Sequence, residues 1–375
     1  NPNLRWDKNY KTNFGIDLRM FDNRLSVTFD AYYDMGREMF AFPGASNLPG
    51  TVGIYAAPEN YSEMDMFGFE AIVGWRQRIN KDMYVSARLG FGYDDNRVRK
   101  YYWVSDEQRT WTDYVKGGRT DRGLWGLSCL GMFRSYQEIE EYFTKYKITN
   151  YLGLTQDQVH PGMLIYEDIR GAKDENGNYT APDGVINSND DAVMISKRAN
   201  NPYTSNLNLN FVYKSLSINA TFQGEWGAYT LMPGALRGES FSDMETTNVS
   251  AMWNDMFIYE DVYDAAGQVI ARANRNGRWP NFGFNKGNIN SVASTFWRIS
   301  ATKILLRNIT LAYTLPKKWA HSIGLSNVRV NATCQNALSL YNSIPGGYWD
   351  STGFSGNYGS YPVVRKITVG VNVTF

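Results

Sequence analysis

The last nine residues of the chain, ITVGVNVTF at 367–375, alternate strictly between apolar and polar side chains. This period of two is that of a β-strand with one apolar side. The open edge of a soluble sheet offers unpaired N–H and C=O groups to any neighbour, so soluble proteins usually protect it with charge, proline or a covering segment. These nine residues carry neither charge nor proline. We therefore expect this strand either to pair with a further strand or to close a barrel.

The same alternation recurs along the chain. Apolar residues take every second position in 14–20 and 25–33, and the Asp-Asn pair at 22–23 separates these segments as in a β-hairpin. We expect 294–315 to form one long strand in which Arg307 interrupts the phase, as a β-bulge would. The other alternating segments lie at 69–75, 83–93, 207–213, 216–222 and 328–334. Together they predict an all-β fold with about nine strands.

The connections between these segments alternate in length. Tight links lie near residues 22, 81, 215 and 321, and the long connections lie at about 41–67, 103–203, 231–293 and 343–362. An antiparallel meander with short turns at one end and long loops at the other is typical of outer-membrane β-barrels. A soluble sandwich has no reason to sort its loops in this way. We therefore expect a transmembrane antiparallel β-barrel with four long extracellular loops.

The polar face of the predicted strands is rich in amides and hydroxyls, which suits a wide, wet lumen of the kind found in barrels of 16 or more strands. Nine strands are an odd number, whereas single-chain bacterial barrels have an even number. We therefore expect the chain to be the C-terminal part of a larger barrel. The polar face comprises Asn206, Asn208, Asn210, Ser217, Asn219, Thr221, Gln223, Arg329, Asn331, Thr333 and Gln335.

Composition excludes several other classes of protein. The 38 Lys and Arg residues balance 37 Asp and Glu residues without a basic block, so electrostatics does not favour a nucleic-acid partner. The two cysteines, Cys129 and Cys334, form neither a disulfide framework nor a metal-binding spacing. The sequence has no apolar run near the roughly 18 residues of a membrane helix. This absence does not exclude a membrane β-barrel, because apolar and polar residues alternate along its strands.

Five ordered blocks resemble the C-terminal part of SusC-type TonB-dependent transporters. They begin with NPNLRWDKNYKTNFGIDLRM, PGMLIYEDIRGAKDENGNYT, NPYTSNLNLNFVYKSLSINA, TLPKKWAHSIGLSNVRVNAT and YPVVRKITVGVNVTF. The resemblance implies a barrel of 22 strands with an N-terminal plug in the outer membrane of a Gram-negative bacterium. It also implies energy supply by TonB–ExbB–ExbD, a SusD-like surface lipoprotein as partner, and pairing of two such complexes. Imported substrates would be glycans or, in some members, peptides, and Phe375 would be the signal read during barrel assembly.

Two sets of residues are candidate sites. DENG at 174–177 and DGVINSND at 183–190 contain the alternating oxygen ligands of a calcium loop, at Asp174, Asn176, Asp183, Asn187 and Asp190. Five intruding residues separate the two halves, so the spacing favours the alternative of Asx-rich turns. Aromatic rings in the long loops would stack on a substrate or, alternatively, pack inside the protein or in an interfacial girdle. Those chosen as substrate contacts are Trp226, Trp253, Trp279, Tyr348 and Trp349.

The function expected from these features is TonB-energised nutrient import without a required cofactor, with a glycan as the preferred substrate. SYQE at 135–138 is a capping box that begins a surface helix, and no catalytic residue is expected. The alternative from another class is a secreted β-rich protein that binds or hydrolyses glycans. A hydrolase needs two carboxylates at a defined separation, and the sequence singles out no such pair.

Overall fold

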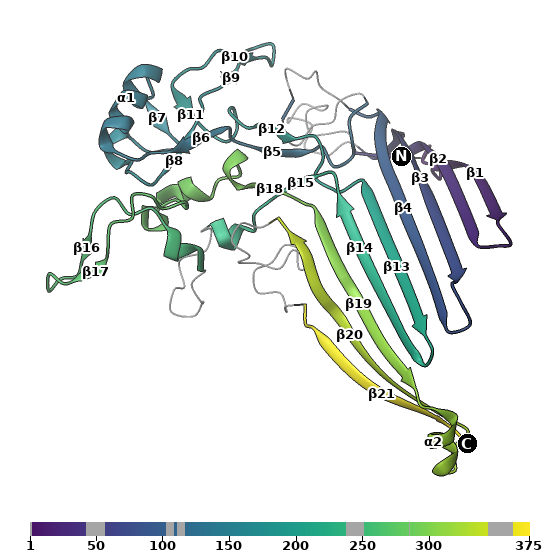
Figure 1. Ribbon diagram of the computed structural model, residues 1–375. Helices are drawn as coiled ribbons and strands as arrows, with labels where there is room; N and C mark the ends of the chain where they lie inside the picture. The colour runs from purple at the N-terminus through teal and green to yellow at the C-terminus, as the bar shows by residue number, and fades with distance from the viewer. Residues whose placement is uncertain are drawn as a thin grey trace.

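A large curved antiparallel sheet and a separately folded unit beside one end of it make up the molecule (Figure 1). The computed structural model describes residues 2–42, 57–102, 109–110, 117–237, 251–284, 286–343 and 363–375. Within these residues, nine strands form one sheet in the order β1-β2-β3-β4-β13-β14-β19-β20-β21. The bounds are β1 Lys8–Met20, β2 Leu25–Ala41, β3 Glu59–Arg78, β4 Met83–Lys100, β13 Tyr203–Tyr213, β14 Leu216–Trp226, β19 Lys303–Thr314, β20 Asn327–Asn342 and β21 Lys366–Thr374.

The tight turns gather at one end of this sheet and the long connections at the other (Figure 1). Phe21, Asp22 and Asn23 all have positive φ, and the Arg24 N–H closes the turn on the Phe21 carbonyl at 3.0 Å. Lys214, also at positive φ, turns β13 into β14. The fourth link contains the short helix α2, Lys317–Ser322, before β20. Sequential hairpins therefore account for the whole order of the sheet.

Two of the long connections fold together into one body, which we call the loop unit: residues 124–202, 227–237, 251–284 and 286–302. Its helices are α1 Tyr136–Tyr146 and the 3₁₀ turns η3 Gln156–Gln158, η4 Gly234–Arg237, η5 Ala251–Asp255, η6 Phe282–Phe284, η7 Lys286–Ser291 and η8 Thr295–Trp297. Its strands are β5 Leu124–Gly126, β6 Cys129–Met132, β7 Asn150–Tyr151, β8 Leu164–Tyr166, β9 Gly171–Lys173, β10 Tyr179–Thr180, β11 Val185–Ile186, β12 Val193–Ser196, β15 Tyr229–Leu231, β16 Val262–Tyr263, β17 Val269–Ala271 and β18 Arg298–Ser300.

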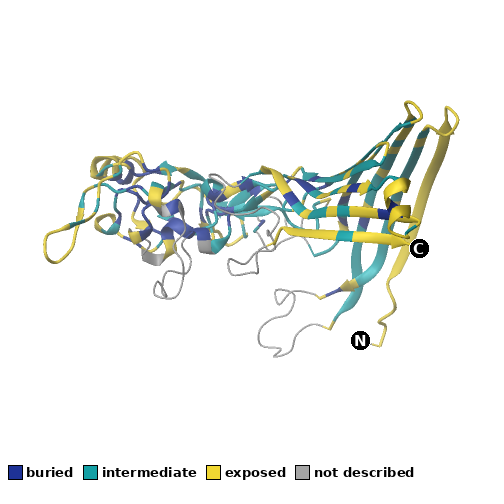
Figure 2. Cartoon of the chain, turned by 60° about the horizontal axis from the view of Figure 1, so that its bottom comes forward, coloured by how far each residue is buried: buried dark blue, intermediate teal, exposed yellow. Residues whose placement is uncertain are grey.

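The main hydrophobic core lies in the loop unit and not beneath the sheet. Figure 2 shows the buried residues concentrated there, whereas the edge strands β1 and β21 are almost wholly exposed. The two connections share the core: Leu127 donates its N–H to the Ala293 carbonyl at 2.8 Å, and Tyr166 donates its hydroxyl to the Ile289 carbonyl at 2.6 Å. No helix in the described part of the chain is long and apolar enough to cross a bilayer.

The expectation of one strand over 294–315 is wrong at its beginning. Residues 295–297 form η8, β18 ends at Ser300, and β19 starts only at Lys303. Trp297 is fully buried in the loop unit, so its apolar character serves that core instead of strand pairing. The phase break at Arg307 is a bulge, because Phe222 pairs with Leu306 and Thr221 pairs with Asn308.

Candidate functional site

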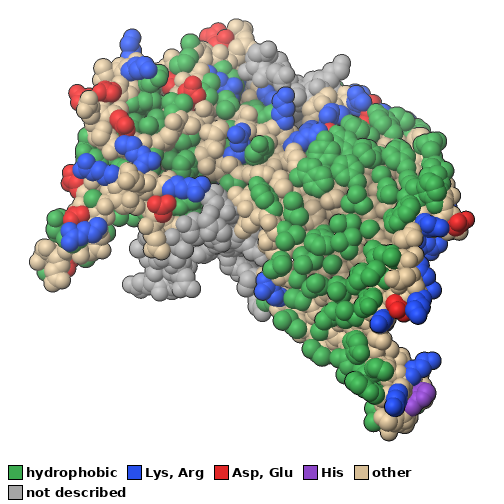
Figure 3. All heavy atoms as spheres, in the orientation of Figure 1, with side chains coloured by type: hydrophobic (Ala, Val, Ile, Leu, Met, Phe, Trp, Pro, Cys, Tyr) green, Lys and Arg blue, Asp and Glu red, His purple; other side chains and the backbone are tan. Residues whose placement is uncertain are grey.

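One face of the sheet is apolar and exposed, and we call it the outer face. A single register row crosses eight strands with apolar side chains throughout, which shows that the alternation of each strand is held in phase with the next. This row is Leu18, Val27, Val73, Leu89, Leu207, Phe222, Leu306 and Leu338. Figure 3 shows the resulting continuous hydrophobic surface over the strands. An apolar surface of this extent on one side of a sheet marks contact with lipid or protein.

The opposite face, the inner face, is polar along the neighbouring row. Its members are Arg19, Ser26, Gly74, Arg88, Asn208, Thr221, Asn308, Gln335 and Lys366. The Thr221 hydroxyl donates to Asn208 Oδ1 at 2.8 Å, and Arg307 Nε donates to Gln223 Oε1 at 2.7 Å. These groups present donors and acceptors to water or to a polar solute.

A cavity of about 460 Å³ lies on this inner face near the tight turns. Its lining combines neutral amides with cationic side chains. The alternation along the strands did not by itself predict a cluster of cations here. The polar lining residues include Arg19, Arg24, Arg76, Arg88, Asn208, Asn210 and Asn219. The arrangement can hydrogen-bond hydroxyls and peptide groups, and it can also attract carboxylates.

An aromatic band crosses the outer face where the sheet approaches the loop unit. Tyr203 and Trp226 stack with ring centroids 6.1 Å apart, and Phe91 lies 5.9 Å from Trp226. Tyr93 lies 5.1 Å from Tyr203. Trp226, chosen from the sequence as a substrate contact, therefore belongs to a band on the apolar side. Its position favours the girdle interpretation, because aromatic residues in membrane barrels gather at the interface.

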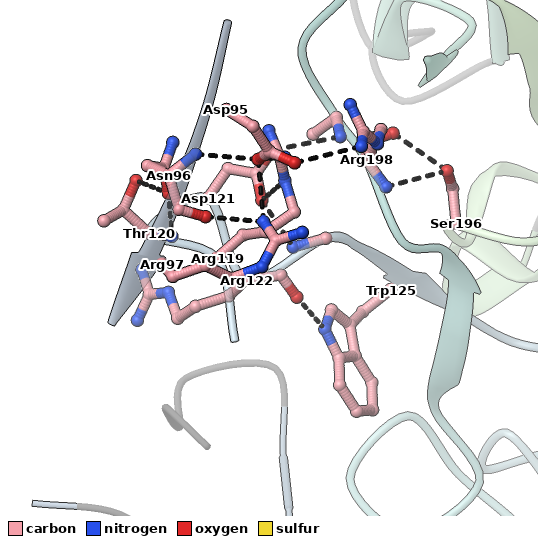
Figure 4. A network of polar contacts seen from close by, with 12 residues as sticks. Asp95, Asn96, Arg97, Arg119, Thr120, Asp121, Arg122, Trp125, Ser196 and Arg198 are labelled. Carbon is pink, nitrogen blue, oxygen red and sulfur yellow. Dashed lines mark hydrogen bonds and ion pairs between the residues drawn. The ribbon is translucent and has the colours of Figure 1, made fainter. Parts of the chain in front are cut away.

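Beyond this band, two buried carboxylates on the outer face hold arginines. Asp95, 2% exposed, forms ion pairs with Arg97 Nη1 at 2.8 Å, with Arg198 Nη2 at 3.0 Å and with Arg119 (Figure 4). On the adjacent strand, Asp65 accepts from Arg37 Nη1 at 2.7 Å and Arg99 Nε at 2.5 Å, and from the Tyr33 hydroxyl. A buried carboxylate surrounded by guanidinium groups avoids the cost of an unpaired buried charge.

Sequence reasoning missed both carboxylates because each stands in the apolar phase of its strand. The available signal was the run Tyr93, Asp95, Arg97 and Arg99, in which the outer-facing positions of β4 change from aromatic to charged. Such a change marks the point where a strand leaves an apolar environment.

The other predicted aromatic contacts lie in different surroundings. Trp279 is 3% exposed and stacks on the fully buried Trp297, with ring centroids 5.9 Å apart, so it packs in the loop unit core. The backbone of Trp253 lies in η5. Tyr348 and Trp349 lie outside the described residues. Of the five predicted contacts, the structure therefore describes only the rings of Trp226 and Trp279, one in the aromatic band on the outer face and the other in the loop unit core.

The predicted calcium ligands form hydrogen bonds within turns. Asp174 Oδ1 accepts from the N–H groups of Asn176 and Asn178, each at 2.9 Å, at the tip of the β9–β10 hairpin. Asp183 caps the Val185 N–H, and Asn187 Nδ2 donates to Asp190 Oδ2 at 2.8 Å. In the described part of the chain, no group of three His, Cys, Asp or Glu side chains is placed to hold a metal ion. The geometry matches the alternative of Asx-rich turns, and calcium binding stays a prediction.

A different carboxylate organises this segment. Asp191 is fully buried and accepts from the N–H groups of Ile169 at 2.8 Å, Arg170 at 3.2 Å and Asn187 at 2.9 Å. Burial raises the pKa of Asp191, although the three N–H donors act in the opposite direction. Burial likewise raises the pKa of Asp168, whose Oδ2 accepts from the Gly184 N–H. These carboxylates fix turns of the loop unit.

The helix predicted from SYQE forms as α1, with one change in its cap. Ser135 Oγ accepts from the Glu138 N–H at 3.2 Å. The Glu138 carboxylate accepts from the Arg134 N–H at 2.6 Å, one residue before the position that a capping box requires. At the other end of the chain, Phe375 follows β21 and is exposed on the outer-face phase. Its role in assembly stays a prediction.

The whole chain aligns in sequence with part of longer known proteins. No protein-family model matches the chain. It is 24% identical over 392 residues to TonB-dependent receptor P3 of Formosa agariphila and 24% identical over 398 residues to receptor P26 of the same organism. The alignments cover all of this chain and 35% of each receptor, so the chain spans about a third of their length.

The fold also matches solved structures. All of the chain superposes on 36% of a chain in the structure of the RagAB peptide transporter, with a TM-score of 0.64 and 19% identity. The RagAB peptide importer in its open-open state gives a TM-score of 0.65 over 35% of that chain. At this identity the likeness shows the fold: the nine-stranded sheet matches part of a TonB-dependent receptor barrel.

Proposed function

We propose that this chain, which is similar to part of TonB-dependent receptors of the SusC/RagA type, forms part of the wall and the outer mouth of a nutrient importer in the outer membrane of a Gram-negative bacterium. The members of this family are transporters and not enzymes. The alternative of a secreted β-rich protein that binds or hydrolyses glycans is accordingly set aside.

The observation that carries this proposal is the opposite character of the two faces of one sheet. Lipid tolerates an apolar outer face and excludes unpaired polar groups, whereas a water-filled lumen favours the amide, hydroxyl and arginine rows of the inner face. A sheet with these two faces separates lipid from an aqueous path. The loop unit, which is made of two long connections, lies at one end of that path.

The proposed substrate is an oligosaccharide, because neutral amides and hydroxyls such as Asn208, Asn219 and Thr221 match the hydrogen-bonding groups of sugars. A peptide is the second candidate. Two features favour it: the similar solved structures belong to a peptide transporter, and the inner face carries Arg76 and Arg88, which would attract carboxylates.

The proposed partners are a SusD-like surface lipoprotein and the TonB–ExbB–ExbD machinery, with two receptor–lipoprotein pairs forming a dimer. Support for the lipoprotein comes from the β16–β17 hairpin, which projects from the loop unit (Figure 1). The hairpin exposes Val262, Tyr263 and Ile270. Exposed apolar residues on the strands of a projecting hairpin suit a protein contact. TonB would act on the receptor from the side of the tight turns, opposite the loop unit.

The test is to purify the full receptor from native outer membranes in mild detergent, then identify co-purifying proteins and any small molecule released by denaturation. An oligosaccharide together with a surface lipoprotein is the expected result, and a family of peptides would favour the second candidate. A receptor that carries neither, and whose deletion leaves growth on every tested glycan and peptide source unchanged, would contradict import.

A further inference from the structure

A cavity lined by cationic side chains lies beside Asp95, where β4 meets the loop unit. Its volume is about 530 Å³. The cationic lining residues are Arg97, Arg109, Arg119, Arg122, Lys197 and Arg198, and the others are Gly117, Gly118, Gly123, Trp125 and Met194. No carboxylate is among the lining residues that the structure describes. Positive charge therefore faces the cavity from three segments: β4, the connection after it, and the residues before β13.

The guanidinium groups are held in place by contacts behind the cavity. Asp95 binds Arg97, Arg119 and Arg198 at once, and Arg119 Nε also lies 3.4 Å from Asp121 (Figure 4). The side chain of Asp95 is completely shielded from solvent. A site whose donors are fixed before a ligand arrives loses less side-chain entropy on binding.

This contact group has an excess of positive charge. Among the described residues, the three arginines around Asp95 form ion pairs with two carboxylates, those of Asp95 and Asp121. Lys197 adds a further exposed cation. Arg198 Nη1 is buried and finds no hydrogen-bond acceptor within the described part of the chain. An oxyanion in the cavity would supply both negative charge and an acceptor.

The cavity also lies at a defined height on the outer face. Along β4, Asp95 and Arg97 follow Phe91 and Tyr93 in the same phase, directly beyond the aromatic band. Figure 3 shows Lys and Arg side chains along the margin of the hydrophobic surface nearest the loop unit. Aromatic belts of membrane proteins lie at the level of the lipid headgroups. The cations therefore stand where the phosphates of an outer-leaflet lipid would lie.

We propose that the cavity lined by Arg97, Arg119, Arg122, Lys197 and Arg198 binds a phosphate monoester, carried by a lipid headgroup of the outer leaflet or by a soluble phosphorylated molecule. Arginine pairs with phosphate through two parallel N–H···O bonds, and several arginines together match its three free oxygens. The site is separate from the substrate path on the inner face, so it operates whether the imported nutrient is a glycan or a peptide.

The test uses the full receptor and a variant that leaves the contacts of Asp95 intact, Arg122→Gln with Lys197→Gln. The lipid probe is lipid A with two phosphates in nanodiscs, compared with its dephosphorylated form, and retention is measured by native mass spectrometry. The soluble probes are inorganic phosphate and glucosamine 1-phosphate, measured by calorimetry in detergent. The control with matched charge removes two cations elsewhere in the loop unit, Lys145→Gln with Arg272→Gln.

We expect the variant to retain lipid A at least about tenfold less well than the wild type, because each lost charge-assisted contact weakens binding substantially. The control variant and the dephosphorylated lipid should show no such difference, and added salt should reduce the wild-type retention. Saturable binding of the soluble probes that the variant loses would assign the site to a soluble phosphate instead. Equal lipid A retention by wild type and variant, with no soluble binding, would overturn the proposal.

Discussion

At the scale of single residues, one buried carboxylate can organise a charged surface next to an apolar one. Asp95 is enclosed, yet Arg97, Arg119 and Arg198 around it remain partly exposed, so the carboxylate positions the arginines that meet the solvent. Alternation predicts which face a residue occupies, but it cannot predict that loop residues 119 and 198 return to cover that face. For this reason the sequence predicts the strand over 83–93, which ends just before Asp95, and leaves the partners of Asp95 unknown.

Replacing Asp95 by Asn should destabilise the receptor by about 3 kcal/mol, because three guanidinium groups would lose the charge they share. The measurement is the unfolding of the purified receptor, followed by its heat-dependent shift in gel mobility. Asp261→Asn is the matched control, since its partner Arg272 is 77% exposed and exposed pairs contribute little. Equal unfolding of both variants would contradict the role assigned to Asp95.

The two cysteines should differ in their reactions with maleimides. Burial raises the pKa of Cys129 to about 11, so it is a neutral thiol at pH 8 and should resist both charged and lipophilic reagents in the folded receptor. Cys334 lies on the outer face of β20, where it pairs with Ile309 and Ile367. Detergent should shield it from charged maleimides, whereas lipophilic maleimides should still react with it. Peptide mass spectrometry after labelling gives the answer, and rapid modification of Cys129 by a charged maleimide would refute the predicted burial.

At the scale of elements, the alternation predicts most of the sheet because each strand must keep one face apolar. The segments around residues 14–33, 69–93 and 207–222 form hairpins as expected. The prediction fails over 295–300, where Phe296 and Trp297 are apolar for a different reason: Trp297 is buried in the loop unit and Phe296 packs against it. A local pattern cannot distinguish an apolar residue that faces lipid from one that packs in a loop.

The two faces of β19 should respond differently to charge. Leu311→Arg places a cation on the outer face and should destabilise the receptor, because a cation on the lipid-facing side of a barrel costs up to about 2 to 4 kcal/mol. Thr310→Arg, one residue away, points the same charge to the inner face and should assemble normally. The yield of heat-modifiable receptor in outer membranes distinguishes the two variants. Similar yields would mean that the outer face does not contact lipid.

At the scale of the whole molecule, the sheet and the loop unit are stabilised in different ways. The sheet has backbone pairing and an exposed apolar face, whereas the loop unit has a core of its own with Trp297 near its centre. The sequence predicted long connections but not that two of them share one core. It also could not predict that Trp279 packs there, because an aromatic residue in a loop has the same sequence signature whether it faces water or a neighbouring ring.

Trp297→Ala should open the loop unit while the sheet stays assembled. The change removes a fully buried ring and its hydrogen bond from Nε1 to the Asn290 carbonyl, at a cost of about 3 to 5 kcal/mol. Whole cells treated with an external protease should then show cleavage within the loop unit. The control is Trp319→Ala on α2, where the ring is 61% exposed. Resistance of Trp297→Ala to the protease would show that the core does not depend on this ring.

The shared core of the loop unit also limits how such a mouth can evolve. Leu127 and Tyr166 come from one connection, and Ile289 and Trp297 come from another more than a hundred residues later. A recombination event that exchanged only one connection would leave half of a core without its complement. Lineages that acquire a new mouth should therefore inherit both connections as one module, while the strands between them change independently.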